Sequence, residues 1–337
     1  MSSRPSNWRT CCASAAAPGA APVGEFELIA RHCTRAPRRA ALGVGDDCAL
    51  LDIAPGQQLA VSSDMLVEGR HFLPTVPPER LGHKALAVNL SDLAACGAEP
   101  LACTLAWSLP RADEDLVAGV MRGFWALADA YGVDLIGGDT TAGPLNLCIT
   151  VLGQVPRGQA LLRSGARPED ELWVSGTLGA ARLALEAFRG TVQLTGEAFE
   201  QARRAMELPA PRVALGMALR GVASSAIDLS DGLAGDLRHV LAASGVGAEI
   251  NVGRLPHSPL LAGQPETLRQ SCVLAGGDDY ELLFTAPPSR RAQVLAAAAR
   301  SATPVTCCGR IVPGRDLVVL DDAGQQLEAP RGFDHFA

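Results

Sequence analysis

The hydrophobic residues of this 337-residue chain fall into short apolar runs that alternate with longer segments of mixed polarity. The runs at 59–61, 101–109 and 133–136 are mostly apolar, which is typical of buried strands. The segments 77–97 and 114–131 place apolar residues at helical spacing, which predicts two helices. Strands that alternate with helices indicate a fold of mixed helices and sheets, of the α/β (α+β) class.

The second half of the chain repeats this alternation after a stretch at 155–170 that is rich in Pro, Gly and Arg. Because 337 residues exceed what one core usually supports, we expect two domains, at 23–153 and 154–337. The Ser/Ala/Pro-rich residues 1–22 are expected to form a disordered extension, with a transit peptide as the alternative. The further predicted elements are a helix at 24–32, strands at 48–53, 145–153 and 171–175, a helix at 180–188, a strand that ends at Asp228 and a helix at 232–241.

Acidic side chains recur where these apolar runs begin or end. Asp64 follows one run together with Ser62 and Ser63, and Asp139 follows two glycines after another. A polar turn explains any single occurrence equally well, since Asp and Ser bond to their own backbone in turns. Five segments share the pattern, however, and their acids are Asp46 with Asp47, Asp64, Asp92, Asp139, and Asp228 with Asp231.

Converging carboxylates destabilise a fold unless cations neutralise them. Two such charges about 4 Å apart repel by roughly 4 kcal/mol at the effective dielectric of a partly screened site. Oxygen ligands without a His/Cys cluster favour magnesium or calcium over zinc, and magnesium takes one or two carboxylates together with substrate phosphates. The chain has neither a P-loop nor the catalytic loop of protein kinases. The residues therefore predict a magnesium–nucleotide site of another kind.

The composition narrows the possible partners and surroundings. A net charge of −7 argues against a nucleic-acid partner, and no apolar run reaches the length of a membrane helix. Of the 29 basic residues only Lys84 is a lysine, so any lysine-dependent phosphate contact must use it. The ten cysteines have no Cys-x-x-Cys spacing. We therefore expect a reduced, cytoplasmic protein rather than a zinc site or a disulfide framework.

Seven short motifs follow one another along the chain. They are Gly-Asp-Asp-Cys-Ala-Leu-Leu at 45–51, Ser-Ser-Asp at 62–64 with His-Phe at 71–72, Ala-Val-Asn-Leu-Ser-Asp-Leu-Ala-Ala at 87–95, Leu-Ile-Gly-Gly-Asp-Thr-Thr at 135–141, Arg-Ser-Gly-Ala at 163–166, Ser-Ala-Ile-Asp-Leu-Ser-Asp-Gly-Leu at 225–233 and Gly-Gly-Asp-Asp-Tyr-Glu-Leu at 276–282. From about residue 24 to the C-terminus, the chain resembles the thiamine-monophosphate kinase family. The wider superfamily includes aminoimidazole ribonucleotide synthetase and selenophosphate synthetase.

The resemblance implies a homodimer whose N-terminal domains pair their sheets into a barrel-like core, with the C-terminal domain folded over the nucleotide. It also implies Mg²⁺-dependent transfer of phosphate from ATP to thiamine phosphate. The metal ligands that it implies, directly or through water, are Asp47, Ser62, Ser63, Asp64, Asp92, Asp139, Asp228 and Asp231. The implied ATP-binding residues are Gly138, Asp139, Arg163 and Ser230, and the implied thiamine phosphate-binding residues are His71, Asp278 and Phe333.

The chemistry of these side chains agrees with that reaction. Phosphoryl transfer needs positioning and charge neutralisation, and a phosphate acceptor is already ionised, so no general base is expected. Asp278 and Phe333 suit a thiazolium cation. Three positions depart from the family pattern: Asp278 stands where Glu is frequent, Phe333 where the aromatic side chain often carries a polar group, and Ser63 where Thr is common.

Two alternatives to a thiamine-phosphate kinase remain open. One is a sister ATP-dependent synthetase of selenophosphate or aminoimidazole ribonucleotide type. The other is a non-catalytic nucleotide-binding protein. The complete set of acids argues against the second alternative, because carboxylates without a counter-charge cost stability and have no structural role of their own.

Overall fold

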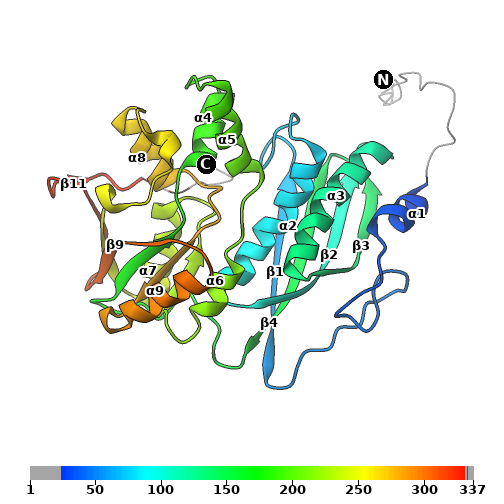
Figure 1. The fold of residues 1–337 in the computed structure, drawn as a ribbon, viewed down its shortest axis with the longest axis horizontal. Helices are drawn as coiled ribbons and strands as arrows, with labels where there is room; N and C mark the ends of the chain where they lie inside the picture. The colour runs from blue at the N-terminus through cyan, green and yellow to red at the C-terminus, as the bar shows by residue number, and fades with distance from the viewer. Residues whose placement is uncertain (1–23, 331, 333–337) are drawn as a thin grey trace, which may run out of the picture.

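The computed structural model describes residues 24–330 and residue 332, which form two α/β units side by side (Figure 1). The first unit holds a four-stranded sheet and the second a seven-stranded sheet. The α/β class expected from the sequence is therefore confirmed. The expectations for residues 1–22 and for Phe333 lie outside the described residues. None of the helices in the described ranges is both long and apolar enough to span a membrane.

The four-stranded sheet has the order β1-β4-β2-β3. Only β2 and β3 are parallel. The register aligns Asp64 with Ile149, Ile149 with Leu105, and Leu105 with Gly138, so one row of residues crosses the whole sheet. The strands are β1 (Gln57–Val67), β2 (Glu99–Leu109), β3 (Asp134–Ala142) and β4 (Asn146–Pro156).

Two long helices, α2 (Pro78–Ala95) and α3 (Glu114–Tyr131), cover one face of this sheet (Figure 1). The Asp113 carboxylate caps α3 by accepting the Leu116 N–H, and Gly132 ends the helix in the left-handed conformation. On the opposite face, Leu59, Val61 and Met65 of β1 are 48%, 57% and 52% exposed. That face of β1 is thus apolar and uncovered in the single chain.

The segment before β1 differs from its prediction. It begins with α1 (Glu25–Leu28), which continues as a π-helical turn (Ile29–Cys33), close to the predicted helix at 24–32. The predicted strand at 48–53 is wrong, because the segment forms only isolated bridges such as Leu42 with Leu50. Its side chains instead pack on the sheet, with Leu51 and Ile53 against a small core around Leu101 and Ile136. Hydrophobic contact, not strand pairing, holds this segment.

The seven-stranded sheet has the order β11-β10-β7-β9-β5-β8-β6. Alternate residues of its strands face opposite cores: Trp173 and Phe284 join the core that also includes the first unit, while Leu172 and Leu283 join a core within the second unit. The strands are β5 (Glu171–Ser175), β6 (Ser225–Asp228), β7 (Gly247–Asn251), β8 (Leu282–Ala286), β9 (Val305–Val312), β10 (Leu317–Leu320) and β11 (Gln326–Leu327). The helices are α4 (Ala180–Phe188), α5 (Gly196–Glu207), α6 (Val213–Ala218), α7 (Leu233–Ser244), α8 (Glu266–Ala275) and α9 (Arg291–Arg300), with short 3₁₀ turns at Val252–Arg254, Pro259–Leu261 and Pro288–Arg290.

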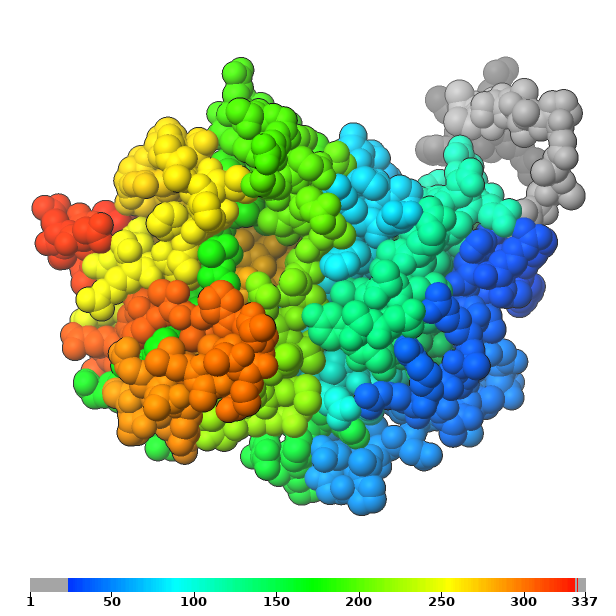
Figure 2. All heavy atoms as spheres, viewed as in Figure 1, coloured from blue at the N-terminus to red at the C-terminus, as the bar shows by residue number. Residues whose placement is uncertain are grey.

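Helix α2 is buried between the two units. Twelve of its 18 residues are buried. It packs on β1 and β4 on one side and on α5, α6 and β6 on the other, where the space-filling view shows the units in close contact (Figure 2). Leu86 and Ile149 of the first unit therefore share one hydrophobic core with Leu215 and Phe284 of the second.

Two glycines allow α2 and α3 to approach closely. A Cβ on Gly82 would lie 1.8 Å from the Val120 carbonyl oxygen, and a Cβ on Gly123 would lie 1.7 Å from that of Glu79. No side chain fits at either position unless the helices move apart.

We expect Gly82→Ala to lower the free energy of unfolding by about 1–3 kcal/mol, because overpacking forces the two backbones apart. Urea or thermal unfolding measures the change. Gly196→Ala is the control, since Gly196 is also helical and a Cβ there meets nothing within 4 Å. Equal stability of the two variants would contradict the close helix contact.

Candidate functional site

Three aspartates meet where β1, α2 and β6 come together. The Ser62 hydroxyl of β1 donates to Asp92 at 2.5 Å, and the Ser91 hydroxyl of α2 donates to Asp228 at 2.7 Å. The side-chain oxygen of Asn89 accepts the backbone N–H of Asp64 at 3.0 Å. The polar residues that interrupt the apolar pattern of α2 thus hold β1 and β6 in place, and sequence reasoning had not assigned Asn89 or Ser91 to the site.

The electrostatics of this cluster reflect burial and like charge. Burial raises the pKa of Asp64 to about 6, with further repulsion from Asp92 and Asp231. Burial and repulsion from Asp92 raise the pKa of Asp228 to about 7. Burial also raises the pKa of Asp92, which the Ser62 hydroxyl and the Arg163 guanidinium oppose. The side chains of Asp64, Asp92 and Asp228 are therefore close enough to disfavour full ionisation.

The loop before α7 adds Ser230 and Asp231 beside the cluster. Asp236, in the first turns of α7, accepts the backbone N–H of Asp231 at 3.1 Å. Burial and repulsion from Asp231 raise the pKa of Asp236 to about 7, and the charge of Arg163 opposes this. Asp236 is not among the site residues predicted from the sequence. Its position one turn into the helix that follows Gly232 is the feature that could have indicated it.

Asp278 and the segment of His71 meet at Lys84 of α2. The Lys84 ammonium donates to Asp278 Oδ2 at 2.9 Å and to the His71 carbonyl oxygen at 3.1 Å. The backbone N–H of Asp278 donates to the Ser230 carbonyl at 2.9 Å, so this loop also adjoins the start of α7. The ring of His71 is oriented by its Nδ1, which accepts the Val67 N–H at 3.0 Å.

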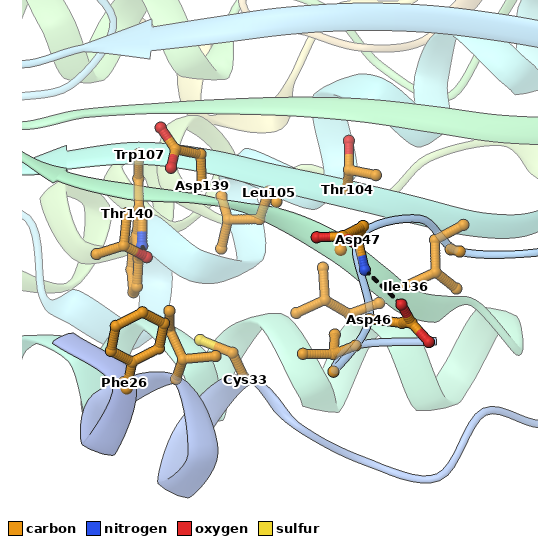
Figure 3. Close-up of a pocket in the computed structure, with 17 residues that line it drawn as sticks. Phe26, Cys33, Asp46, Asp47, Thr104, Leu105, Trp107, Ile136, Asp139 and Thr140 are labelled. Carbon is orange, nitrogen blue, oxygen red and sulfur yellow. Dashed lines mark hydrogen bonds between the residues drawn. The ribbon is translucent and has the colours of Figure 1, made fainter. Parts of the chain in front are cut away.

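Asp47, Gly138 and Asp139 lie at the other edge of the four-stranded sheet. Asp47 and Asp139 line opposite parts of a cavity of about 670 Å³ between β3 and the segment before β1 (Figure 3). Gly138 has φ +154°, and a Cβ there would lie 1.8 Å from the Leu105 carbonyl oxygen, so only glycine fits. Three strand spacings, about 14 Å, separate β1 from β3, so Asp139 and Asp64 of one chain do not share a ligand atom.

One further predicted residue, Ser63, does not direct its side chain to the acid cluster. The Ser63 hydroxyl bonds to β4, to the Thr150 hydroxyl at 2.9 Å and the Ile149 carbonyl at 3.2 Å. Neighbouring strand residues point to opposite faces, so the hydroxyls of Ser62 and Ser63 diverge. Phe333 lies outside the described residues.

Known proteins share this arrangement over nearly the whole chain. Family models described as AIR synthase related protein, N-terminal and C-terminal domain, match residues 45–155 and 167–322. A thiamine-monophosphate kinase of Salmonella typhimurium is 44% identical over 326 residues, covering 93% of this chain and 98% of the relative. The crystal structure of thiamine-monophosphate kinase from Stenotrophomonas maltophilia K279a has a TM-score of 0.81 at 44% identity, covering 90% and 96% of the two chains. A structure of AaThiL complexed with AMPPCP and TMP has a TM-score of 0.74 at 29% identity, covering 85% and 89%.

The donor set at the acid cluster fits a magnesium ion. Among residues 24–330 and 332, no group of three His, Cys, Asp or Glu side chains could hold a metal ion by itself. Magnesium does not require such a group, because it keeps water molecules and takes ligands from substrate phosphates beside one or two carboxylates. The oxygen-only donors and the mutual repulsion of Asp64, Asp92 and Asp228 favour a hard cation at this place.

We expect the metal-free protein to lose stability as pH rises from about 4 to above 7. Asp64, Asp228 and Asp236 have folded-state pKa values of about 6 to 7. Since unfolded aspartates release their protons near pH 4, the folded state binds more protons within this window, and stability falls as pH rises through it. Thermal unfolding in EDTA at several pH values measures the effect.

Asp228→Asn is the matched variant for this titration. In EDTA, the stability of this variant should depend less on pH than that of the unmodified chain. Added Mg²⁺ should stabilise the unmodified chain more at pH 8 than at pH 5, and it should stabilise the variant less than the unmodified chain. A metal-free Asp228→Asn protein that loses as much stability as the unmodified chain over this range would argue against the assignment.

Proposed function

The chain belongs to the AIR synthase related protein family and, within it, to the thiamine-monophosphate kinases, and from this we propose that it transfers the γ-phosphate of ATP to thiamine phosphate, giving ADP and thiamine diphosphate. The observation that carries the proposal is the meeting of Asp64, Asp92 and Asp228 at the junction of the two units. The AaThiL complex with AMPPCP and TMP supports the choice of both substrates.

Asp64, Asp92, Asp228 and Asp231 are the residues that would hold magnesium, with the Ser62 hydroxyl bonded to Asp92. Ser63 would contribute through its main chain, since its side chain bonds to β4. Magnesium held by these residues would supply positive charge to neutralise the charge that develops on the transferring phosphoryl group. Direct in-line transfer then needs no general base, because the acceptor phosphate is already ionised.

Arg163 and Ser230 are proposed to bind ATP beside the metal ligands. The charge of Arg163 acts on both Asp92 and Asp236, so its exposed guanidinium lies near these two carboxylates. A planar guanidinium in this position can bind phosphate oxygens with two hydrogen bonds. Asp236 would keep the loop of Ser230 and Asp231 in shape through its bond to the Asp231 N–H.

Thiamine phosphate is proposed to bind against His71, Asp278 and Phe333. Burial raises the pKa of Tyr280 well above its usual value, and the charges of Asp278, Asp64 and Asp228 add to this. Tyr280 and Asp278 therefore adjoin the acid cluster. A substrate whose thiazolium ring lies at Asp278 would then direct its phosphate toward the metal ligands.

We also propose that the active form is a homodimer. The exposed apolar face of β1, with Leu59, Val61 and Met65, supports pairing with a second copy of the sheet. Asp139 lies on β3, three strand spacings from Asp64, and Asp47 lines the same cavity as Asp139, so both would complete the site of the other subunit rather than their own. ATP and free magnesium as reactants fit a cytoplasmic location.

Purified protein given ATP, Mg²⁺ and thiamine phosphate should form ADP and thiamine diphosphate in equal amounts. Chromatographic separation of the products measures both. ATP binding without thiamine diphosphate formation would instead favour a sister synthetase or a non-catalytic binding protein.

Asp64→Asn and Asp139→Asn should each abolish turnover while the protein stays folded, because each removes a charge proposed to hold the metal or the nucleotide. Product formation and circular dichroism measure the two properties. Asp129→Asn is the control, since Asp129 lies on α3 and its exposed carboxylate forms ion pairs with Arg35 and Arg38, which are also exposed. Near-normal turnover of either site variant would refute the role of that residue.

Val61→Glu should convert the dimer to monomer, because a charge at the centre of the apolar β1 face opposes burial of that face. Light scattering coupled to size exclusion measures the molar mass. Leu295→Glu is the control, because Leu295 is 50% exposed but lies on α9 of the other unit. A Val61→Glu protein that remains dimeric would place the interface elsewhere.

A further inference from the structure

Lys84 joins the two segments that carry the proposed thiamine phosphate ligands. It lies on α2 and is only 2% exposed. Its ammonium donates to the His71 carbonyl in the first unit and to Asp278 Oδ2 in the second. A single buried cation thus sets the spacing between two groups that come from different halves of the chain.

The composition of the chain sets Lys84 apart from its other basic residues. Lysine occurs once among 29 basic residues, and the other 28 are arginines. The one lysine is also the most buried basic side chain among the ion pairs of the described residues, at 3% side-chain exposure. An ammonium directs its donors tetrahedrally from a compact head, whereas a guanidinium is larger and planar, so the two are not interchangeable in a closed site.

The loop that carries Asp278, one partner of Lys84, has an unusual backbone conformation. Asp278 and Tyr280 have φ values of +60° and +49°, which side chains other than glycine seldom adopt. The Tyr280 hydroxyl donates to Asp278 Oδ1 at 3.2 Å, while Lys84 donates to Oδ2. Both oxygens of the carboxylate are therefore oriented, and the ion pair stabilises the loop in its strained form.

We propose that Lys84 is a positioning residue of the thiamine phosphate site, whose ammonium fixes the His71 segment and the Asp278 carboxylate relative to each other before the substrate binds. This inference rests on the function proposed above. It assigns Lys84 no contact with ATP or with the reacting atoms, so its removal affects recognition of thiamine phosphate selectively.

Steady-state kinetics of Lys84→Met and Lys84→Arg test the proposal. The KM for thiamine phosphate should rise about tenfold or more in both variants, because Met removes the charged donor and the larger, planar guanidinium of Arg cannot place its donors as the ammonium does. The KM for ATP should change by less than about twofold. Lys84→Arg with an unchanged KM for thiamine phosphate would overturn the proposal. Equal increases in both KM values would also overturn it.

Arg80→Met is the matched control, because it tests whether loss of any ion pair between the two units raises the KM for thiamine phosphate. Arg80 lies one turn before Lys84 on α2 and pairs with Glu200 and Glu207 of α5, so it also bridges the two units. Its loss should leave the KM for thiamine phosphate within about twofold of the unmodified value, since it touches no proposed ligand. A comparable rise in this variant would reduce Lys84 to a structural contact and overturn the proposal.

A measurement on the unmodified chain covers the case in which the Lys84 variants fail to fold. Because the chain has one lysine, protein labelled with [¹⁵Nζ]lysine gives a single ammonium resonance that needs no assignment. Thiamine phosphate should shift this resonance, and AMPPCP alone should not. A resonance that saturating thiamine phosphate leaves unmoved overturns the positioning role. Unmodified protein that forms no thiamine diphosphate overturns the proposed function and this inference together, whereas normal turnover with an unmoved resonance overturns only the inference.

Discussion

The burial of helix α2 is the constraint on which the site depends. A helix buried on all sides cannot leave polar groups without partners, since each would cost several kcal/mol. Lys84, Asn89, Ser91 and Asp92 meet this requirement by bonding outward to His71 and Asp278, to β1, to Asp228 and to Ser62 respectively. The same bonds that satisfy the helix fix both sheets around the proposed catalytic centre.

The acid cluster opposes this stabilisation. Asp228 and Asp236 are buried, Asp64 is half-buried, and all three have raised pKa values, so the ionised site is less stable than a neutral one would be. Arg163 offsets part of the repulsion for Asp92 and Asp236. Bound magnesium would supply the remaining positive charge, which explains why the carboxylates are kept although they weaken the empty fold.

The sequence predicted most elements well, because strand and helix periodicity differ clearly in segments such as 114–131 and 171–175. It missed β7 and β9, whose short runs contain glycine and adjacent cysteines, and it could not give the strand order that places Asp139 far from Asp64. The prediction from the sequence also treats Ser62 and Ser63 alike, although neighbouring side chains on a strand point in opposite directions and the difference could have been anticipated. The contact of Lys84 with Asp278 could not, since 194 residues separate the two positions.

The shared core around α2 also bears on how the chain folds. Leu86 and Ile149 pack in the same core as Leu215 and Phe284, so each unit completes the burial of the other. A fragment that ended after β4 would expose one side of α2 together with its paired polar groups, and a fragment that began at β5 would lack the part of the core that the first unit supplies. The chain therefore has two sheets but one cooperative folding unit, and neither half is expected to be stable as an autonomous domain.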